Sequence, residues 1–75
     1  MQQKSLLSLD IGKTYVLSHV DLQGALRHRI LDLGFTEGAE IKCLFKAPSG
    51  SPLAFLIRGS VIALRKTDAE KIFVL

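Results

Sequence analysis

The side chains with the most obvious chemical potential are a Gly-Lys-Thr triplet, two histidines and one cysteine. Gly12-Lys13-Thr14 matches the end of a phosphate-binding loop, whose glycine-rich backbone cradles phosphates while Lys and Thr reach the phosphates and magnesium. That motif also needs a glycine five positions earlier, where this chain has Leu7, and a helix directly afterwards, where β-branched and aromatic residues predict a strand. The triplet therefore does not predict nucleotide hydrolysis.

The possible imidazole and thiolate ligands for a metal ion are His19, His28 and Cys43. None lies three or four positions from another, the spacing that local metal sites use. We expect His19 in a loop, His28 on the polar side of a helix and Cys43 in the core as a small apolar residue. The sequence therefore predicts no cofactor and no dedicated metal site, with carboxylates gathered from separate loops as the remaining alternative.

Catalysis by a nucleophile needs a serine or cysteine next to a base and an orienting acid. Two histidines and scattered serines do not define such an arrangement, so we predict that the protein is not an enzyme. A single cysteine also excludes an internal disulfide, which fits a reducing compartment.

The densest basic group is Arg27, His28 and Arg29. One interpretation is a solvated helix face whose cations suit the C-terminal end of the helix dipole, with Asp32 pairing to Arg29 or His28. Leu31 favours a second interpretation, because it projects away from the apolar stripe of the same helix. A leucine beside arginines has the composition of an interface anchor with a charged rim.

The helix that must carry this group is predicted to begin near residue 22, with Ser18 and Asp21 as capping side chains. It should end at Gly34, which can take the left-handed conformation of a C-terminal cap, with Phe35 folding back onto Ile30. At about 100° per residue, four apolar residues form the stripe that faces the sheet. They are Leu22, Leu26, Ile30 and Leu33.

The rest of the chain reads as short strands joined by turns. Alternation predicts that Ile41, Cys43 and Phe45 point inward. Turn residues at 48–52 and at Arg58-Gly59 predict two hairpins, and the spacing of Thr67 and Glu70 predicts a capping box on a short helical turn. The predicted strands are 14–17, 40–46, 53–57, 61–64 and 72–74.

These elements predict a mainly β fold in one domain spanning residues 1–75. Five short strands in a chain too small for a sandwich favour a small barrel. One α-helix lies between the first and second strands, and a short helical turn precedes the last strand. The barrel buries only a small core, as expected for this length.

Charge and hydropathy limit the function classes. The net charge of +3 is mild, so acidic partners are allowed but not required. Binding of single-stranded nucleic acid would require aromatic residues interleaved with lysines, and the sequence does not show this pattern. No apolar run approaches the roughly 18 residues of a membrane span, and the N-terminus lacks the features of a secretion signal. We expect a cytoplasmic protein without membrane insertion.

Several of these segments together resemble the FeoA family, and the resemblance covers nearly the whole chain. They are Leu6, Leu9 and Gly12, the run LRHRILDLGFTEG at 26–38, KAP at 46–48, IALR at 62–65, and Ala69, Ile72 and Val74. The resemblance implies an SH3-like barrel with added helices. It also implies a cytosolic accessory protein of bacterial ferrous iron uptake that binds or regulates FeoB, a membrane transporter with a cytosolic GTP-hydrolysing domain.

Two alternatives stay open beside that implied function. The same fold occurs as the C-terminal domain of iron-dependent repressors, so a nucleic-acid-binding module is one, although we expect no nucleic acid partner. A ferrous-ion carrier is the other, and self-association is also allowed.

On this resemblance we place a candidate partner-binding surface on the helix end and on the first hairpin tip. It consists of Arg27, Leu31, Asp32, Phe35, Pro48, Ser49, Gly50, Ser51 and Pro52. We assign Gly34, Gly38 and Gly59 to structural turns.

Overall fold

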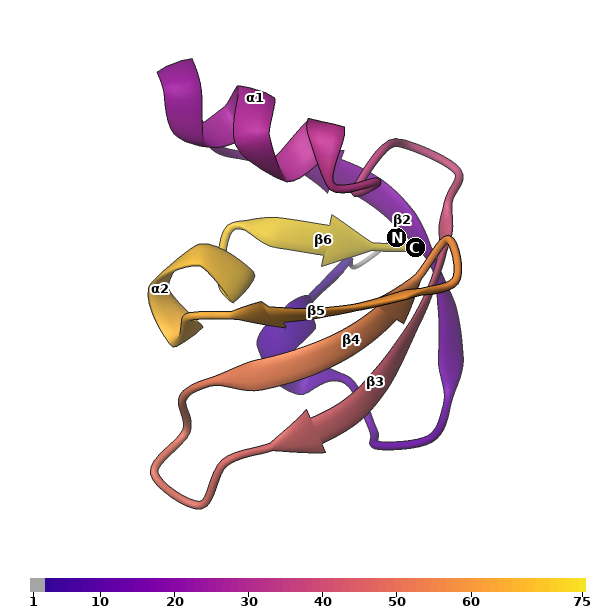
Figure 1. Ribbon diagram of the computed structural model, residues 1–75. Helices are drawn as coiled ribbons and strands as arrows, with labels where there is room; N and C mark the ends of the chain where they lie inside the picture. The colour runs from indigo at the N-terminus through magenta and orange to yellow at the C-terminus, as the bar shows by residue number, and fades with distance from the viewer. Residues whose placement is uncertain (1–2) are drawn as a thin grey trace.

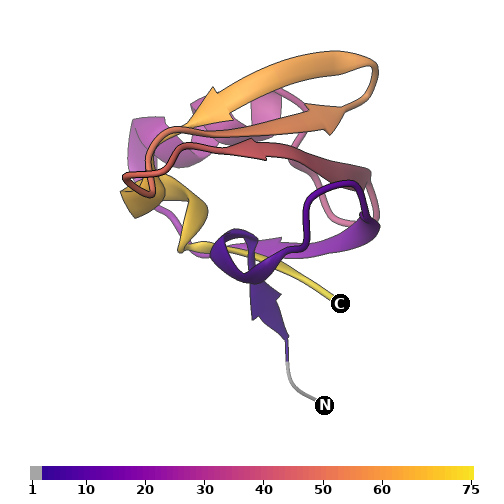
Figure 2. The same ribbon diagram turned by 90° about the horizontal axis from the view of Figure 1, so that it is seen from below.

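The computed structural model describes residues 3–75, in which six antiparallel strands form one curved sheet in the order β1-β6-β2-β3-β4-β5 (Figure 1). Seen along the sheet, β3, β4 and β5 lie on one side of the interior and β2 and β6 on the other (Figure 2). The elements are β1 (Lys4–Ser5), η1 (Leu6–Ser8), β2 (Thr14–Val20), α1 (Gly24–Asp32), β3 (Glu40–Lys46), β4 (Leu53–Ile57), β5 (Ser60–Leu64), α2 (Lys66–Ala69) and β6 (Ile72–Val74).

The predicted fold class is confirmed, with one strand more than the five expected. The additional strand, β1, has two residues and pairs with β6 through Lys4 opposite Val74. Two residues are too few to show the alternation by which a strand is recognised. The helix between the first long strands and the short helical turn before the last strand are both present.

The core lies between the two halves of the curved sheet and is apolar throughout. Its largest fully buried side chains come from most elements, and Cys43 points inward among them as predicted. Burial of such side chains supplies most of the favourable free energy of folding. The core cluster is Leu6, Leu9, Leu17, Val20, Ile30, Phe35, Ala39, Ile41, Cys43, Leu53, Phe55, Ile57, Leu64, Ala69, Ile72 and Val74.

Helix α1 begins later than predicted. Strand β2 continues to Val20, which lies opposite Ile72 of β6, and the backbone N–H of Asp21 donates to the Lys71 carbonyl at 2.7 Å. The residues expected to cap the helix are therefore used by the sheet. The N-cap is Gln23, which makes no side-chain capping hydrogen bond.

The end of α1 follows the prediction. The Phe35 N–H donates to the Ile30 carbonyl at 3.3 Å and the Gly34 N–H to the Leu31 carbonyl at 3.0 Å, which is the Schellman pattern. Gly34 has a φ of +112°, a conformation that L side chains rarely adopt. The corner after the helix therefore requires glycine.

The prediction that Phe45 points inward is wrong. The register of β3 against β4 shifts between Cys43, opposite Phe55, and Phe45, opposite Ala54. This β-bulge inserts one residue and reverses the alternation beyond it, so the Phe45 side chain is 51% exposed.

Two other local predictions also need correction. His19 lies in β2 rather than in a loop, and its ring stacks on Phe73 with centroids 4.8 Å apart. The short helix α2 has Arg65 as its N-cap without a side-chain capping hydrogen bond, so the capping box expected from Thr67 and Glu70 does not form.

Candidate functional site

The helix part of the predicted surface is only partly on the surface. Arg27 and Asp32 are exposed on α1, whereas Leu31 is half-buried and packs against the core. The placement of Phe35 in this surface is wrong, because its side chain is fully buried. The fold-back after Gly34 carries the ring inward, so Phe35 supports this corner and cannot touch a partner.

The hairpin part of the predicted surface lies far from the helix. The β3–β4 connection projects at the end of the molecule opposite α1 (Figure 1). Pro48, Ser49 and Pro52 are exposed there, and Gly50 and Ser51 are half-buried. The structure therefore does not bring the two predicted halves together into one continuous surface.

A groove of about 370 Å³ lies between α1 and the β5–α2 segment. We call it the α1–β5 groove. The apolar part of its lining includes the buried Ile30 and Leu64 and the 37% exposed Leu33. Its lining residues are Leu26, Arg29, Ile30, Leu33, Ala63, Leu64, Arg65 and Asp68.

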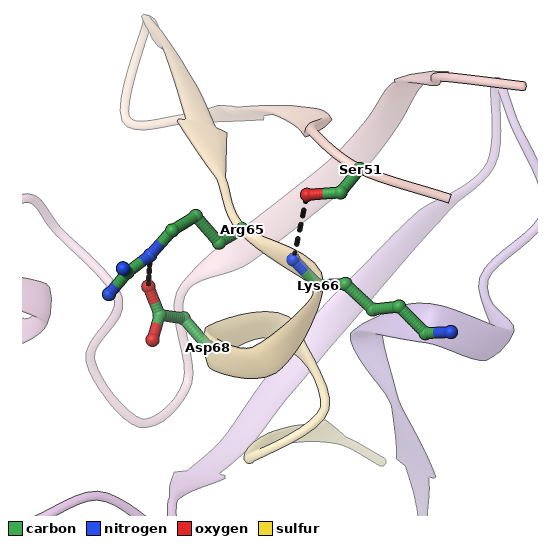
Figure 3. Close-up of polar contacts among 4 residues, drawn as sticks. All are labelled: Ser51, Arg65, Lys66 and Asp68. Atoms are coloured by element: carbon green, nitrogen blue, oxygen red, sulfur yellow. Dashed lines mark hydrogen bonds and ion pairs between the residues drawn. The ribbon is translucent and has the colours of Figure 1, made fainter. Parts of the chain in front are cut away.

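Two arginines give the rim of this groove a positive character. Arg29 comes from the last turn of α1, and Arg65 follows β5. The Arg65 Nε–H donates to Asp68 Oδ2 at 3.2 Å, and the rest of the guanidinium extends beyond that carboxylate (Figure 3). The Arg65 side chain is 74% exposed and that of Asp68 only 12%, so the pair leaves the cation accessible.

The first residue of α2 is hydrogen-bonded to the β3–β4 hairpin tip. The backbone N–H of Lys66 donates to Ser51 Oγ at 3.2 Å, while the Lys66 side chain points away from this contact (Figure 3). The hairpin tip thereby helps to hold α2, the short helix whose Asp68 orients Arg65 in the groove. Ser51 therefore contacts α2 and does not line the groove.

The groove was missed by sequence reasoning because the helix faces differ from the predicted ones. The stripe prediction put Leu33 inside and Leu31 outside, but Leu33 is exposed in the groove and Leu31 packs on the core. The sequence did contain one signal for the groove: Arg29 and Leu33 are four positions apart, a spacing that places them on the same helix face. Nothing local indicated that β5 would lie beside that face.

A second hollow, of about 480 Å³, lies near the β4–β5 turn, at the ends of β3 and β4 that are opposite the β3–β4 hairpin tip. Arg58, which contributes to it, packs its side chain over Gly34 and donates from Nη2 to Thr36 Oγ1 at 2.8 Å. Arg58 and Gly59 both have positive φ, of 50° and 79°, as a two-residue type I′ hairpin turn requires. Arg58 thus joins that turn to the corner after α1.

The buried thiol of Cys43 offers little reactive chemistry. Burial raises the pKa of the Cys43 thiol, an effect that nearby Lys46 and the backbone of Phe45 partly oppose. A thiol of raised pKa inside an apolar core is a poor nucleophile. Among residues 3–75, no three His, Cys, Asp or Glu side chains gather in a way that could hold a metal ion, and no helix is long and apolar enough to cross a membrane.

The curved sheet and its helices define a small SH3-like domain. The family model of the FeoA domain matches residues 4–75, and the chain belongs to the FeoA family. A curated relative, the Fe(2+) transport protein A/Fe(2+) transporter FeoB fusion protein of Porphyromonas gingivalis, is 36% identical over 69 residues. The match covers 92% of this chain and 8% of the fusion protein, so this chain spans a small part of that protein's length.

Solved structures of FeoA proteins have the same fold. The solution structure of FeoA from Chlorobium tepidum is 34% identical with a TM-score of 0.86, over 93% of this chain and 67% of that one. The zinc-complexed FeoA of Stenotrophomonas maltophilia, a procaryotic SH3 domain protein, is 31% identical with a TM-score of 0.83, over 95% and 88%. These likenesses extend over almost all of the chain.

Proposed function

We propose that this protein is a cytosolic accessory component of ferrous iron uptake that docks on a FeoB-type membrane transporter and assists it without catalysing a reaction. The observation that carries this proposal is the relative in which a FeoA segment and FeoB form one polypeptide. Fusion keeps two modules at high effective concentration, which favours modules that work in contact. Membership of the FeoA family supports a role for this chain in ferrous iron transport.

A role by contact, as an adaptor, fits the chemistry of the described residues. Cys43 is buried, and the His19 ring is stacked on Phe73. The α1–β5 groove instead combines apolar side chains with arginines at its rim, a composition typical of protein interfaces. The accessible features are therefore those of a recognition surface.

We place the docking surface at the α1 end of the molecule. Arg27 and Asp32 are exposed on the helix and remain candidates, and Leu33 replaces Phe35 as the apolar residue of this region that a partner can reach. The hairpin tip at 48–52 is a separate candidate, because it lies at the opposite end. Variants at the two ends can therefore be compared directly.

The test is the affinity of this protein for the purified cytosolic part of the FeoB-type transporter from the same organism. Loss of a central interface side chain commonly costs about 2 kcal/mol or more, so we expect Leu33→Asp to weaken binding by at least about tenfold. Arg27→Glu should weaken it less, because Arg27 is exposed on α1 but does not line the α1–β5 groove. Ser49→Asp at the hairpin tip is the matched control and should bind normally.

Three results would count against this proposal at different levels. Absence of binding by the unchanged protein would contradict docking on the transporter. Normal binding by both helix variants would move the surface away from α1, and loss of binding by Ser49→Asp would place it at the hairpin tip. Circular dichroism of each variant must first show that it is folded.

A further inference from the structure

Strand β5 is an edge strand with one unpaired side. Within residues 3–75 it ends the sheet, with β4 as its only neighbour. Ile57 and Ser60 flank the two-residue turn, so the hydrogen-bonded pairs with β4 fall at Ser60, Ile62 and Leu64. The N–H and C=O groups of Val61 and Ala63 consequently point away from β4.

This edge lacks the features by which edge strands usually avoid pairing. Ser60–Leu64 contains no charged residue and no proline, and Val61 is 65% exposed. The other edge strand, β1, has only two residues, one of which is Lys4. The two edges of the sheet are thus unequal, and β5 is the one able to accept another strand.

The α1–β5 groove lies beside this unpaired edge. Ala63, with its outward backbone groups, lines the groove, and Leu26 and Leu33 of the helix segment line it too. A segment paired to β5 could therefore bury alternate apolar side chains in the groove.

Charge determines which segment fits. Arg58 and Arg65 bracket β5, and Arg29 stands on the helix side of the groove. Asp68 lines the groove as well but is already paired with Arg65. The cations outside this pair, Arg29 and Arg58, favour acidic residues in the incoming segment.

The same arginines oppose a second copy of this chain. Symmetrical antiparallel pairing of two β5 strands about Ile62 would place Arg58 of one copy beside Lys66 of the other, with Arg65 close by. Like charges at directly opposed positions destabilise a strand pair. A different protein is therefore the better occupant.

We propose that β5 binds an extended, acidic and apolar segment of a partner protein as a seventh strand, with the apolar side chains of that segment in the α1–β5 groove. The identity of the partner rests on the proposed function, whereas the binding mode rests on the edge, the groove and their charges. The two can be tested separately.

The experiment measures amide hydrogen exchange by NMR with two probes. One is the cytosolic part of the FeoB-type transporter, and the other is a synthetic peptide of alternating Val and Glu. We expect each probe to slow exchange at Val61 and Ala63, whose N–H groups are free, and to change Ile62 and Leu64 little, because β4 already protects them.

Variants of the edge supply the binding test. Ala63→Pro removes an outward N–H without breaking the β4 ladder and should weaken affinity about tenfold or more. Val61→Glu should weaken it further than Val61→Lys, since only the first repels acidic residues. The matched control is Ile11→Lys, at an exposed apolar residue that does not line the groove, and the Val61 pair serves if Ala63→Pro fails to fold.

The outcomes separate the two proposals. Binding of the transporter with unchanged exchange at Val61 and Ala63 and normal affinity of the edge variants would overturn the seventh strand and leave the docking function intact. Protection by the peptide but no transporter binding would support the edge and overturn the function. Protection that grows with protein concentration alone would show that a second copy is the occupant, which overturns the choice of partner.

Discussion

Two glycine-containing corners of this molecule, at 33–36 after α1 and at 48–52 between β3 and β4, look alike in sequence and differ in structure. The sequence predicts that Phe35 of the first corner and all five residues of the second belong to one partner-binding surface. The first corner turns Phe35 into the core, and the second keeps small polar residues at the surface. A glycine shows where the chain can reverse, but the next large side chain decides whether the corner belongs to the core.

The two corners are also held by different interactions. The first depends on a fully buried ring and on Arg58 packed across Gly34. The second depends on surface hydrogen bonds, such as Gly50 N–H to the Ala47 carbonyl at 2.8 Å and Ser49 Oγ to the Ser51 carbonyl at 3.1 Å. Damage to the first should therefore lower global stability, while damage to the second should stay local.

The largest effect expected from this contrast is that of Phe35→Ala. Removal of a fully buried phenylalanine costs about 3–5 kcal/mol of unfolding free energy, because transfer and cavity terms add. Denaturant unfolding followed by circular dichroism measures it. The control is Phe45→Ala, which truncates a 51% exposed ring and should cost much less. Equal losses for both would break the distinction between buried corner and surface.

A smaller loss is expected for Gly34→Ala. At a φ of +112° an L residue is strained, and its Cβ would lie 3.1 Å from Arg58 Cδ. The exposed Arg58 side chain can shift, so most of the cost should be backbone strain of about 1–3 kcal/mol. Repeating the substitution in an Arg58→Ala background separates the terms. A cost that vanishes there would assign the requirement for glycine to the side-chain contact.

Local signals were enough to predict much of this architecture. The Gly34 cap, the β3–β4 and β4–β5 hairpins and the inward position of Cys43 follow from turn chemistry and alternation. The reversal at Phe45 could not be predicted, because a bulge is a single extra residue that leaves composition unchanged. Short-range pattern therefore gave the elements but not every register.

The candidate site was harder to predict because it depends on long-range placement. Leu31 packs on the core and Leu33 is exposed, the reverse of the prediction. This difference depends on the orientation of the nine-residue helix against the sheet and not on the periodicity of the helix. The groove also needs β5 at the edge of the sheet beside α1, a neighbour relation between segments about 30 residues apart. The sequence indicated the helix, whereas only the topology showed that β5 lies beside it.

Strand β3 joins the two corners, and Cys43 at its centre is a probe of both. Burial raises the thiol pKa in the folded protein, so the unfolded chain ionises first as the pH rises. The contribution of the buried thiol to the unfolding free energy is full below the ordinary thiol pKa and is lost as the pH rises above it. The unfolding free energy should therefore fall on the alkaline side. Comparison with Cys43→Ala at neutral and alkaline pH isolates this contribution. An equally steep fall in that variant would assign the effect to other groups.

The reaction rate of the same thiol can show which of the two corners is coupled to the core. It should react slowly with iodoacetamide in the unchanged protein, because its side chain is fully buried. Phe35→Ala should raise that rate and Ser49→Ala should not, since only the first substitution lowers the free energy of core opening. A rise in both would show that the hairpin tip is coupled to the core after all.

The smallest effect expected is that of Ser51→Ala at the second corner. It removes the acceptor for the Lys66 N–H at a half-exposed position where water can replace it, so the loss of stability should stay below about 1 kcal/mol. Its consequence should instead appear at α2, as faster amide exchange at Lys66. Ser49→Ala, which leaves that acceptor in place, is the matched control. If Ser51→Ala also weakened binding at the α1–β5 groove, the tip would influence partner recognition through α2, and the two ends of the molecule would be connected without sharing a surface.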